Sequence, residues 1–237
     1  MSLETISLME LNNSEYQISE NCKLVFIHIK IKNIEKRISD LVKVISDTSW
    51  IDKMNSVFAQ DSYRINVNRT VAELVNNVMK SVNDEITSEL GEYLVSMSSQ
   101  EVLCKELNHI LIPLSELWKE KVKGNPGFDF HTQTPSELIS FGEAKYSFNS
   151  NPYNTAIEQI KDFISLGKDV ADLVHLENIP NVSTTALYQV KASIRAFSIA
   201  FSLNAQNIKL IIKNVVKKLK EANLLRHPEI FIIGVEI

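Results

Sequence analysis

The stretches that decide the fold of this chain are GFDFH at residues 127–131 and ISFGEAKY at residues 139–146. Both read as strands, and the apolar run that leads into Glu143 is typical of a buried strand. Side chains two apart on a strand share a face, so Glu143 and Lys145 point the same way and Asp129 can oppose them from an adjacent antiparallel strand. The sequence therefore predicts two carboxylates and one ammonium group side by side.

This set of side chains is typical of a site for a hard divalent cation. Mg²⁺ prefers oxygen ligands and usually takes one or two protein carboxylates. We expect Asp129 and Glu143 to bind Mg²⁺, with Mn²⁺ as a substitute ion, and the main-chain carbonyl of Ala144 to add an oxygen. Lys145 would stabilise negative charge on a scissile phosphate. The pattern indicates phosphodiester hydrolysis. The alternative is that Glu143 and Lys145 form a structural ion pair on a sheet with one solvent-exposed face.

Two flanking segments carry further polar candidates. Residues 86–95 read as the end of a long amphipathic helix with Glu89 and Glu92 on one face, and a helix carboxylate can reach into such a site. Residues 154–164 read as the next helix, in which Gln159 could contact a phosphate or orient the lysine.

The chain resembles the PD-(D/E)xK nuclease superfamily, in particular its RecB-like branch, in the order of its elements. That order is a helix with Glu, a strand with Asp, a strand with Glu-x-Lys and a helix with Gln. More narrowly, the chain resembles the HamA family, the nuclease of the Hachiman anti-phage defence system. The resemblance lies in Gly91-Glu92, in the segments 127–131 and 141–146, and in Ala156-Ile157. The similarity covers roughly residues 70–237.

The resemblance implies an effector nuclease that works beside a superfamily 2 helicase partner, HamB-like, and degrades DNA when the complex is triggered. It implies that Asp129 and Glu143 are metal ligands, that Lys145 is the catalytic lysine and that Glu92 is the helix carboxylate and a further metal ligand, with Glu89 as the alternative to Glu92. The chain departs from the motif at Phe128, which stands where the superfamily name has proline.

Other residues are candidates for DNA contacts. His131 shares the strand face of Asp129 and either touches a phosphate or the metal-bound water or is a partly buried packing residue. A basic turn near the site carries Lys119, Lys121 and Lys123. Four lysines recur at helical spacing and form either a DNA-binding patch or a solvated helix face: Lys209, Lys213, Lys217 and Lys220.

Composition limits the remaining possibilities. The formal net charge of −4 does not suggest a strongly basic, free-standing DNA binder. Six glycines and six prolines in 237 residues favour long regular elements. The chain shows neither a membrane-length apolar run nor a signal-peptide pattern, so we expect no membrane partner and a cytoplasmic location. Cys22 and Cys104 are interpreted as buried small hydrophobes.

Periodicity and capping patterns predict the remaining elements. Strands are expected at 24–31 and 230–237. A helix is expected at 33–60 with a break near 47–49, and another from an N-cap at Thr70 to Glu92. Further helices are expected across 103–110, around 170–173, from Ser183 to 203, and at 207–220.

We expect an α/β fold, with a mixed central sheet flanked by helices and a PD-(D/E)xK, restriction-endonuclease-like core. Residues 1–66 would form an N-terminal strand and helix extension, and 67–237 the nuclease domain, whose last strand ends with the chain and suggests a truncated C-terminus. Two alternatives to the helicase-coupled nuclease stay open. One is a stand-alone type II restriction endonuclease that acts as a homodimer, and the other is an inactive nuclease-fold module that regulates a helicase.

Overall fold

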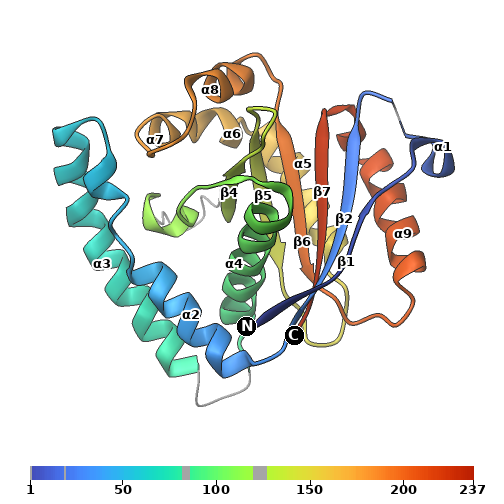
Figure 1. Cartoon of the computed structure of the whole chain (residues 1–237), viewed down its shortest axis with the longest axis horizontal. Helices are drawn as coiled ribbons and strands as arrows, with labels where there is room; N and C mark the ends of the chain where they lie inside the picture. The colour runs from blue at the N-terminus through green and yellow to red at the C-terminus, as the bar shows by residue number, and fades with distance from the viewer. Residues whose placement is uncertain (1, 19, 82–85, 120–126) are drawn as a thin grey trace.

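The computed structural model describes residues 2–18, 20–81, 86–119 and 127–237 and shows an α/β fold on one mixed sheet (Figure 1). The described strands are β1 Leu3–Glu10, β2 Lys23–Ile31, β3 Ile110–Leu111, β4 Phe130–Gln133, β5 Ile139–Lys145, β6 Ala196–Ser202 and β7 Glu229–Glu236. Their spatial order is β1-β2-β7-β6-β5-β4-β3. Strands β2, β7, β6 and β5 run parallel, and β1, β4 and β3 join antiparallel at the two sides.

Helices cover both faces of this sheet. They are α1 Asn13–Tyr16, α2 Ile34–Ser46, α3 Val57–Ser81, α4 Ser88–Leu107, α5 Tyr153–Ser165, α6 Lys168–Ala171, α7 Leu173–Leu176, α8 Thr184–Lys191 and α9 Ile208–Glu221. Helix α4 packs on β4 to β7, with α2 and α3 outside it, and α5 lies on the other side of the sheet with α9 beside it (Figure 1). The expected mixed sheet flanked by helices is confirmed.

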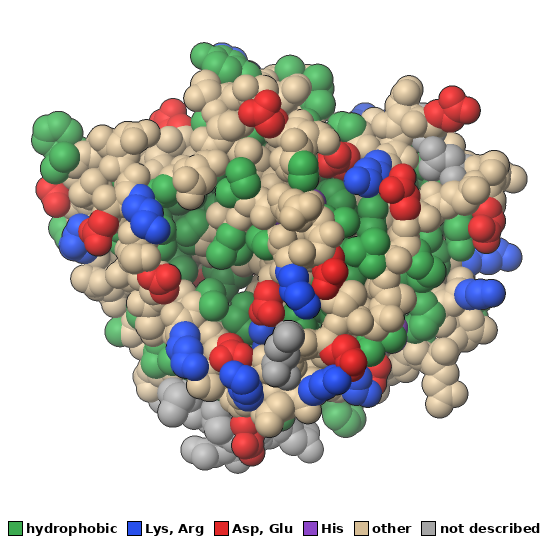
Figure 2. Space-filling model, in the orientation of Figure 1, with side chains coloured by type: hydrophobic (Ala, Val, Ile, Leu, Met, Phe, Trp, Pro, Cys, Tyr) green, Lys and Arg blue, Asp and Glu red, His purple; other side chains and the backbone are tan. Residues whose placement is uncertain are grey.

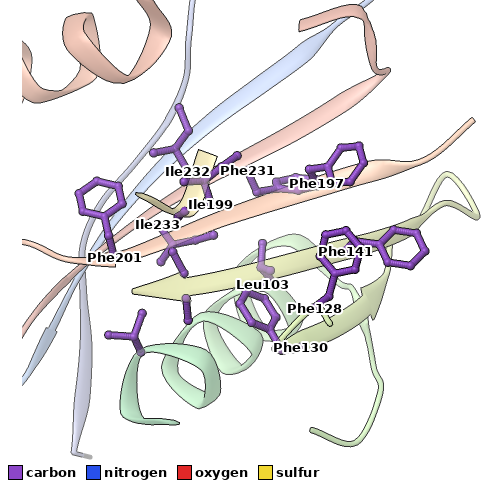
Figure 3. Close-up of a cluster of buried hydrophobic side chains, with 14 of the residues drawn as sticks. Leu103, Phe128, Phe130, Phe141, Phe197, Ile199, Phe201, Phe231, Ile232 and Ile233 are labelled. Atoms are coloured by element: carbon purple, nitrogen blue, oxygen red, sulfur yellow. The ribbon is translucent and has the colours of Figure 1, made fainter. Parts of the chain in front are cut away.

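The core lies between the parallel strands and these helices. All seven residues of β6 are buried, as expected for a strand covered on both faces. Phenylalanine rings fill much of the space around β5 and β6 (Figure 3). The Phe128 ring lies 5.0 Å from the Phe141 ring and 5.1 Å from the Phe163 ring, measured between centroids, and so ties β5 to α5. This packing holds the end of β5 in place.

Several predicted elements are confirmed. The strands expected at 24–31 and 230–237 are β2 and β7, which pair in parallel at the middle of the sheet. The lysine-bearing helix is α9, and its N-cap Asn207 accepts a hydrogen bond from the Leu210 amide at 3.1 Å. The expected break near 47–49 separates α2 from a short 3₁₀ turn at Ile51–Lys53.

The helix expected from Thr70 to Glu92 is wrong in both its bounds. Thr70 lies in the middle of α3, because residues 57–81 contain no glycine or proline to interrupt the helix. The helix that carries Glu92 begins at Ser88, where the Thr87 hydroxyl accepts from the Leu90 amide at 3.2 Å. Glu92 therefore lies near the start of α4, and the helix expected across 103–110 is the second half of α4 followed by β3.

The long helix expected from Ser183 to 203 is also wrong. Ser183 is the N-cap of α8, but α8 ends at Lys191, and Ser193 takes a left-handed φ of 65°. Residues 196–202 then form β6 between β5 and β7, because hydrogen bonds to two neighbouring strands override the helical pattern. The helix expected around 170–173 is two short helices, α6 and α7.

The N-terminal residues take part in the same sheet as the candidate site. β1 pairs with β2, and β2 pairs with β7 along its whole length. Cys22 is buried, Cys104 is half-buried, and burial raises the pKa of both thiols to about 11. None of the helices in the described ranges is long and apolar enough to cross a membrane.

The buried His109 should make stability sensitive to acid. Its Nδ1 lies 2.9 Å from the Thr132 hydroxyl, and burial lowers its pKa from 6.5 to about 4. The unfolded chain takes up this proton at a higher pH, so stability should fall as pH drops from about 6.5 to about 4, by about 3 kcal/mol. Denaturant unfolding of wild type and His109→Asn across this range checks it, because the variant should lose that part of the slope. Parallel curves would contradict it.

Candidate functional site

The two faces of β5 carry different chemistry. Glu143 and Lys145 share one face, and Gly142 and Ala144 share the other. A Cβ atom on Gly142 would lie 2.4 Å from the Phe130 ring, so an apolar side chain covers that second face closely. Glu143 is fully buried, whereas the Lys145 side chain keeps 14% of its exposure. The strand therefore brings a charged pair to the edge of the core.

Asp129 is fixed beside this pair by the backbone of β5. Its amide donates to the Gly142 carbonyl at 2.9 Å, and its Oδ2 accepts from the Ala144 amide at 2.8 Å. The β4–β5 pairing ends at Phe130 and Gly142, so the Asp129 side chain occupies the edge position that a further strand residue would take. Carbonyls two apart on a strand face the same edge, so the Ala144 carbonyl points toward the Asp129 side.

The two carboxyl groups interact strongly. Burial raises the pKa of Glu143 well above its usual range, the Asp129 charge raises it further, and Lys145 opposes both effects. Burial likewise raises the pKa of Asp129, against the pull of Lys145 and the Ala144 amide. Among the described residues, Glu143 Oε2 is buried without a hydrogen-bond partner. A buried carboxylate oxygen without a partner is unfavourable, and either a proton shared with the Asp129 carboxyl group or a bound cation would satisfy it.

Lys145 connects Glu143 to the helix carboxylate. Its Nζ lies 2.7 Å from Glu143 Oε1 and 3.7 Å from Glu92 Oε1. Burial tends to lower the pKa of the amine, but the neighbouring carboxylates outweigh it and raise the pKa, so the amine stays protonated. The Glu92 carboxylate also accepts a hydrogen bond from the Tyr146 backbone amide, and burial raises the pKa of Glu92.

Glu89 and Gln159 are the remaining flanking candidates. Glu89 is exposed and its carboxylate accepts from the Tyr93 hydroxyl at 3.1 Å. Gln159 is half-buried on α5, and in the described part of the chain no hydrogen bond joins it to Lys145 or to the carboxylates. Glu92 is thus the helix carboxylate that the structure brings to Lys145.

His131 belongs to a buried network behind Asp129. Its Nδ1 lies 3.0 Å from the Ser115 hydroxyl and its Nε2 lies 2.9 Å from Asp172 Oδ2. Burial, with the nearby Lys119 charge, lowers its pKa to about 4, so the ring is neutral and donates from Nε2 to the carboxylate. The side chain has no exposed surface, which fits the packing interpretation and excludes contact with DNA in this conformation.

Sequence reasoning missed Asp172, which anchors this network. Its Oδ2 also accepts from Lys119 Nζ at 2.7 Å, and Lys119 donates to the Phe128 carbonyl at 3.2 Å, one residue before Asp129. Burial opposes ionisation of Asp172, but the bonds from His131 and Lys119 outweigh it and hold its pKa below the usual range. Asp172 is far from its partners in sequence, so no local pattern marks it.

The other expected basic contacts are placed as follows. Lys121 and Lys123 lie outside the described residues. The four candidate lysines on α9, at 209, 213, 217 and 220, are all exposed, opposite a buried face, and Lys217 lies 3.9 Å from Glu221. This arrangement is that of a solvated helix face.

The residues present fit a magnesium ion that takes few ligands from the protein. Asp129, Glu143 and the Ala144 carbonyl are hard oxygen donors on one edge of the sheet, and Glu143 Oε2 lacks another partner among the described residues. Mg²⁺ needs few protein ligands because water and phosphate complete its octahedron. No group of three or more His, Cys, Asp or Glu side chains suited to a metal occurs within 2–18, 20–81, 86–119 and 127–237, so Glu92 does not complete a three-carboxylate cluster.

Searches against protein-family models, curated proteins and solved structures found no match for this chain.

The close approach of α4 to the end of β5 gives a test of this geometry. A Cβ atom on Gly91 would lie 2.2 Å from the Tyr146 ring, which follows Lys145 directly. Gly91→Ala should therefore destabilise the fold by about 1–3 kcal/mol through overpacking. In thermal or denaturant unfolding, Tyr146→Ala should be less harmful in the Gly91→Ala background than alone. Additive effects would contradict this contact.

Proposed function

We propose that this protein is a metal-dependent DNA nuclease of the PD-(D/E)xK type. The observation that carries the proposal is the buried Glu143 carboxylate, which lies beside Asp129, is bound by Lys145 Nζ at 2.7 Å and keeps one oxygen without a described partner. A buried carboxyl pair with a strongly shifted pKa and an adjacent cation is typical of catalytic sites.

The chain's residues would divide the work as follows. Asp129, Glu143 and the Ala144 carbonyl would hold Mg²⁺ or Mn²⁺, which when bound lowers the pKa of water and polarises the phosphate. Lys145 would keep its proton and stabilise charge that develops on the phosphate oxygens. Glu92 would orient the Lys145 amine, from 3.7 Å away. Gln159 makes no such contact with the described residues, and a role for it would depend on the bound substrate.

The biological setting is a further part of the proposal and depends on the family resemblance. We propose that the protein is the effector nuclease of a helicase-coupled anti-phage defence system, with a HamB-like superfamily 2 helicase as its partner. Positive and negative side chains are interspersed on the face shown in Figure 2, and the net charge is −4. A partner that brings DNA to the site would supply the affinity that this surface lacks.

Two observations favour a second candidate, an inactive nuclease-fold module that regulates a helicase. The described residues hold no three-ligand metal group, and Lys145 already satisfies one Glu143 oxygen. A module of this kind would bind its partner but neither the metal nor the scissile phosphate.

Cleavage assays separate the two candidates. With Mg²⁺, the protein should degrade DNA, and EDTA should stop the reaction. Glu143→Gln and Lys145→Ala should each reduce the rate by at least about 10²- to 10³-fold, because each removes charge stabilisation at the site. The matched control is Glu35→Gln, an exposed carboxylate on α2, which should cleave like wild type. The assay is run with and without the helicase, and full cleavage by both site variants would contradict the proposal.

Metal binding can be measured without turnover. At Mn²⁺ concentrations ten times the Kd, binding should stabilise the fold by about 1.4 kcal/mol, which corresponds to about 3–5 °C in Tm. Asp129→Asn and Glu143→Gln should lose this increase, and electron paramagnetic resonance should show less bound Mn²⁺. If both variants keep the wild-type Tm shift, the ion binds elsewhere.

A further inference from the structure

The loop that follows β5 displays an aromatic side chain beside the candidate site. Phe148 lies three residues after Lys145, and 85% of its surface is exposed. Three residues span at most about 10 Å, which matches roughly three nucleotides along a strand. Most phenylalanines of this protein are buried, so the position of Phe148 requires an explanation.

Hydrogen bonds hold this loop in place on both sides of Phe148. The Ser147 amide donates to the Ser202 hydroxyl at 2.8 Å, and that hydroxyl donates back to the Ser147 carbonyl at 2.9 Å. The Asn204 side-chain amide donates to the carbonyls of Ser147 at 2.9 Å and Ser150 at 2.7 Å. Phe148 is therefore presented by a loop anchored to the end of β6.

The chemistry of the loop favours contact with bases over contact with phosphates. Residues 146–152 contain aromatic, hydroxyl and amide side chains together with Pro152, and no charged residue. A loop without carboxylates does not repel a polyanion, and a loop without lysine or arginine gains little from phosphate neutralisation. An exposed ring with neighbouring amides matches the face and edges of an unpaired base.

We propose that Phe148 stacks on an unpaired nucleobase within about three nucleotides of the phosphate held at Asp129, Glu143 and Lys145. The substrate class is then single-stranded DNA, or duplex DNA with frayed or unwound bases, because a paired base inside a duplex does not offer its face to a protein ring. This inference rests on the proposed nuclease function and specifies its substrate.

The test measures binding separately from cleavage. Single-stranded oligonucleotides that carry 2-aminopurine are titrated with the full chain in the Glu143→Gln background with EDTA, where cleavage is blocked. Stacking on Phe148 should change the 2-aminopurine fluorescence on binding. Phe148→Ala should weaken binding by about 5- to 150-fold and remove the change, whereas Phe148→Trp should keep both.

The chain offers a matched control in Phe58, which is 89% exposed. It lies near the start of α3, and α3 begins at the opposite end of the molecule from the end of β5 (Figure 1). Phe58→Ala should bind the oligonucleotide like the parent protein. An abasic oligonucleotide of equal length should bind the parent and Phe148→Ala equally, because it offers no base to stack.

The outcomes distinguish the two proposals. Wild-type cleavage of DNA together with equal binding by Phe148→Ala and Phe58→Ala would overturn the stacking inference and leave the nuclease function standing. Phe148-dependent fluorescence changes without cleavage under any condition would support the stacking inference and count against the chemistry. Failure of the parent protein to bind the single-stranded oligonucleotide would overturn the stacking inference directly.

Discussion

The early end of the β4–β5 pairing is the constraint on which the candidate site depends. β4 pairs with β5 only as far as Gly142, whereas β6 pairs with it on to Lys145. In the described part of the chain, the Ala144 amide faces an edge that no strand residue occupies, and a buried backbone donor needs a partner. The Asp129 carboxylate supplies that partner at 2.8 Å, and the same contact places it beside Glu143.

The electrostatics follow from this placement. A buried carboxylate such as Glu143 is unfavourable alone, and a second carboxylate nearby makes ionisation harder still. Lys145 offsets part of this cost at 2.7 Å, while Glu92 holds the amine from the α4 side at 3.7 Å. The cluster is a poor way to stabilise a sheet, because apolar residues of similar size would do so without desolvating charges. The proposed metal-dependent chemistry would account for a cluster that contributes little to stability.

The surroundings keep this cluster rigid on several sides. Behind Asp129, Lys119 donates to the Phe128 carbonyl and to Asp172, so a partly buried ion pair holds the chain that enters β4. Beyond Lys145, the Gly91 backbone and the Tyr146 ring are in close contact, and Ser202 fixes the loop that follows. A site held by packing and hydrogen bonds from separate elements is pre-organised for its ligand.

The sequence by itself indicated the α/β class, the strands found at 139–145 and near 230–237, and the shared face of Glu143 and Lys145, because the two-residue period of a strand is a local property. Only the tertiary structure decided that 196–202 is a strand, because neighbours far along the chain override local propensity. It also decided that His131 is buried against Asp172, forty-one residues away. Burial and pairing across the fold depend on three-dimensional neighbours, which no local pattern contains.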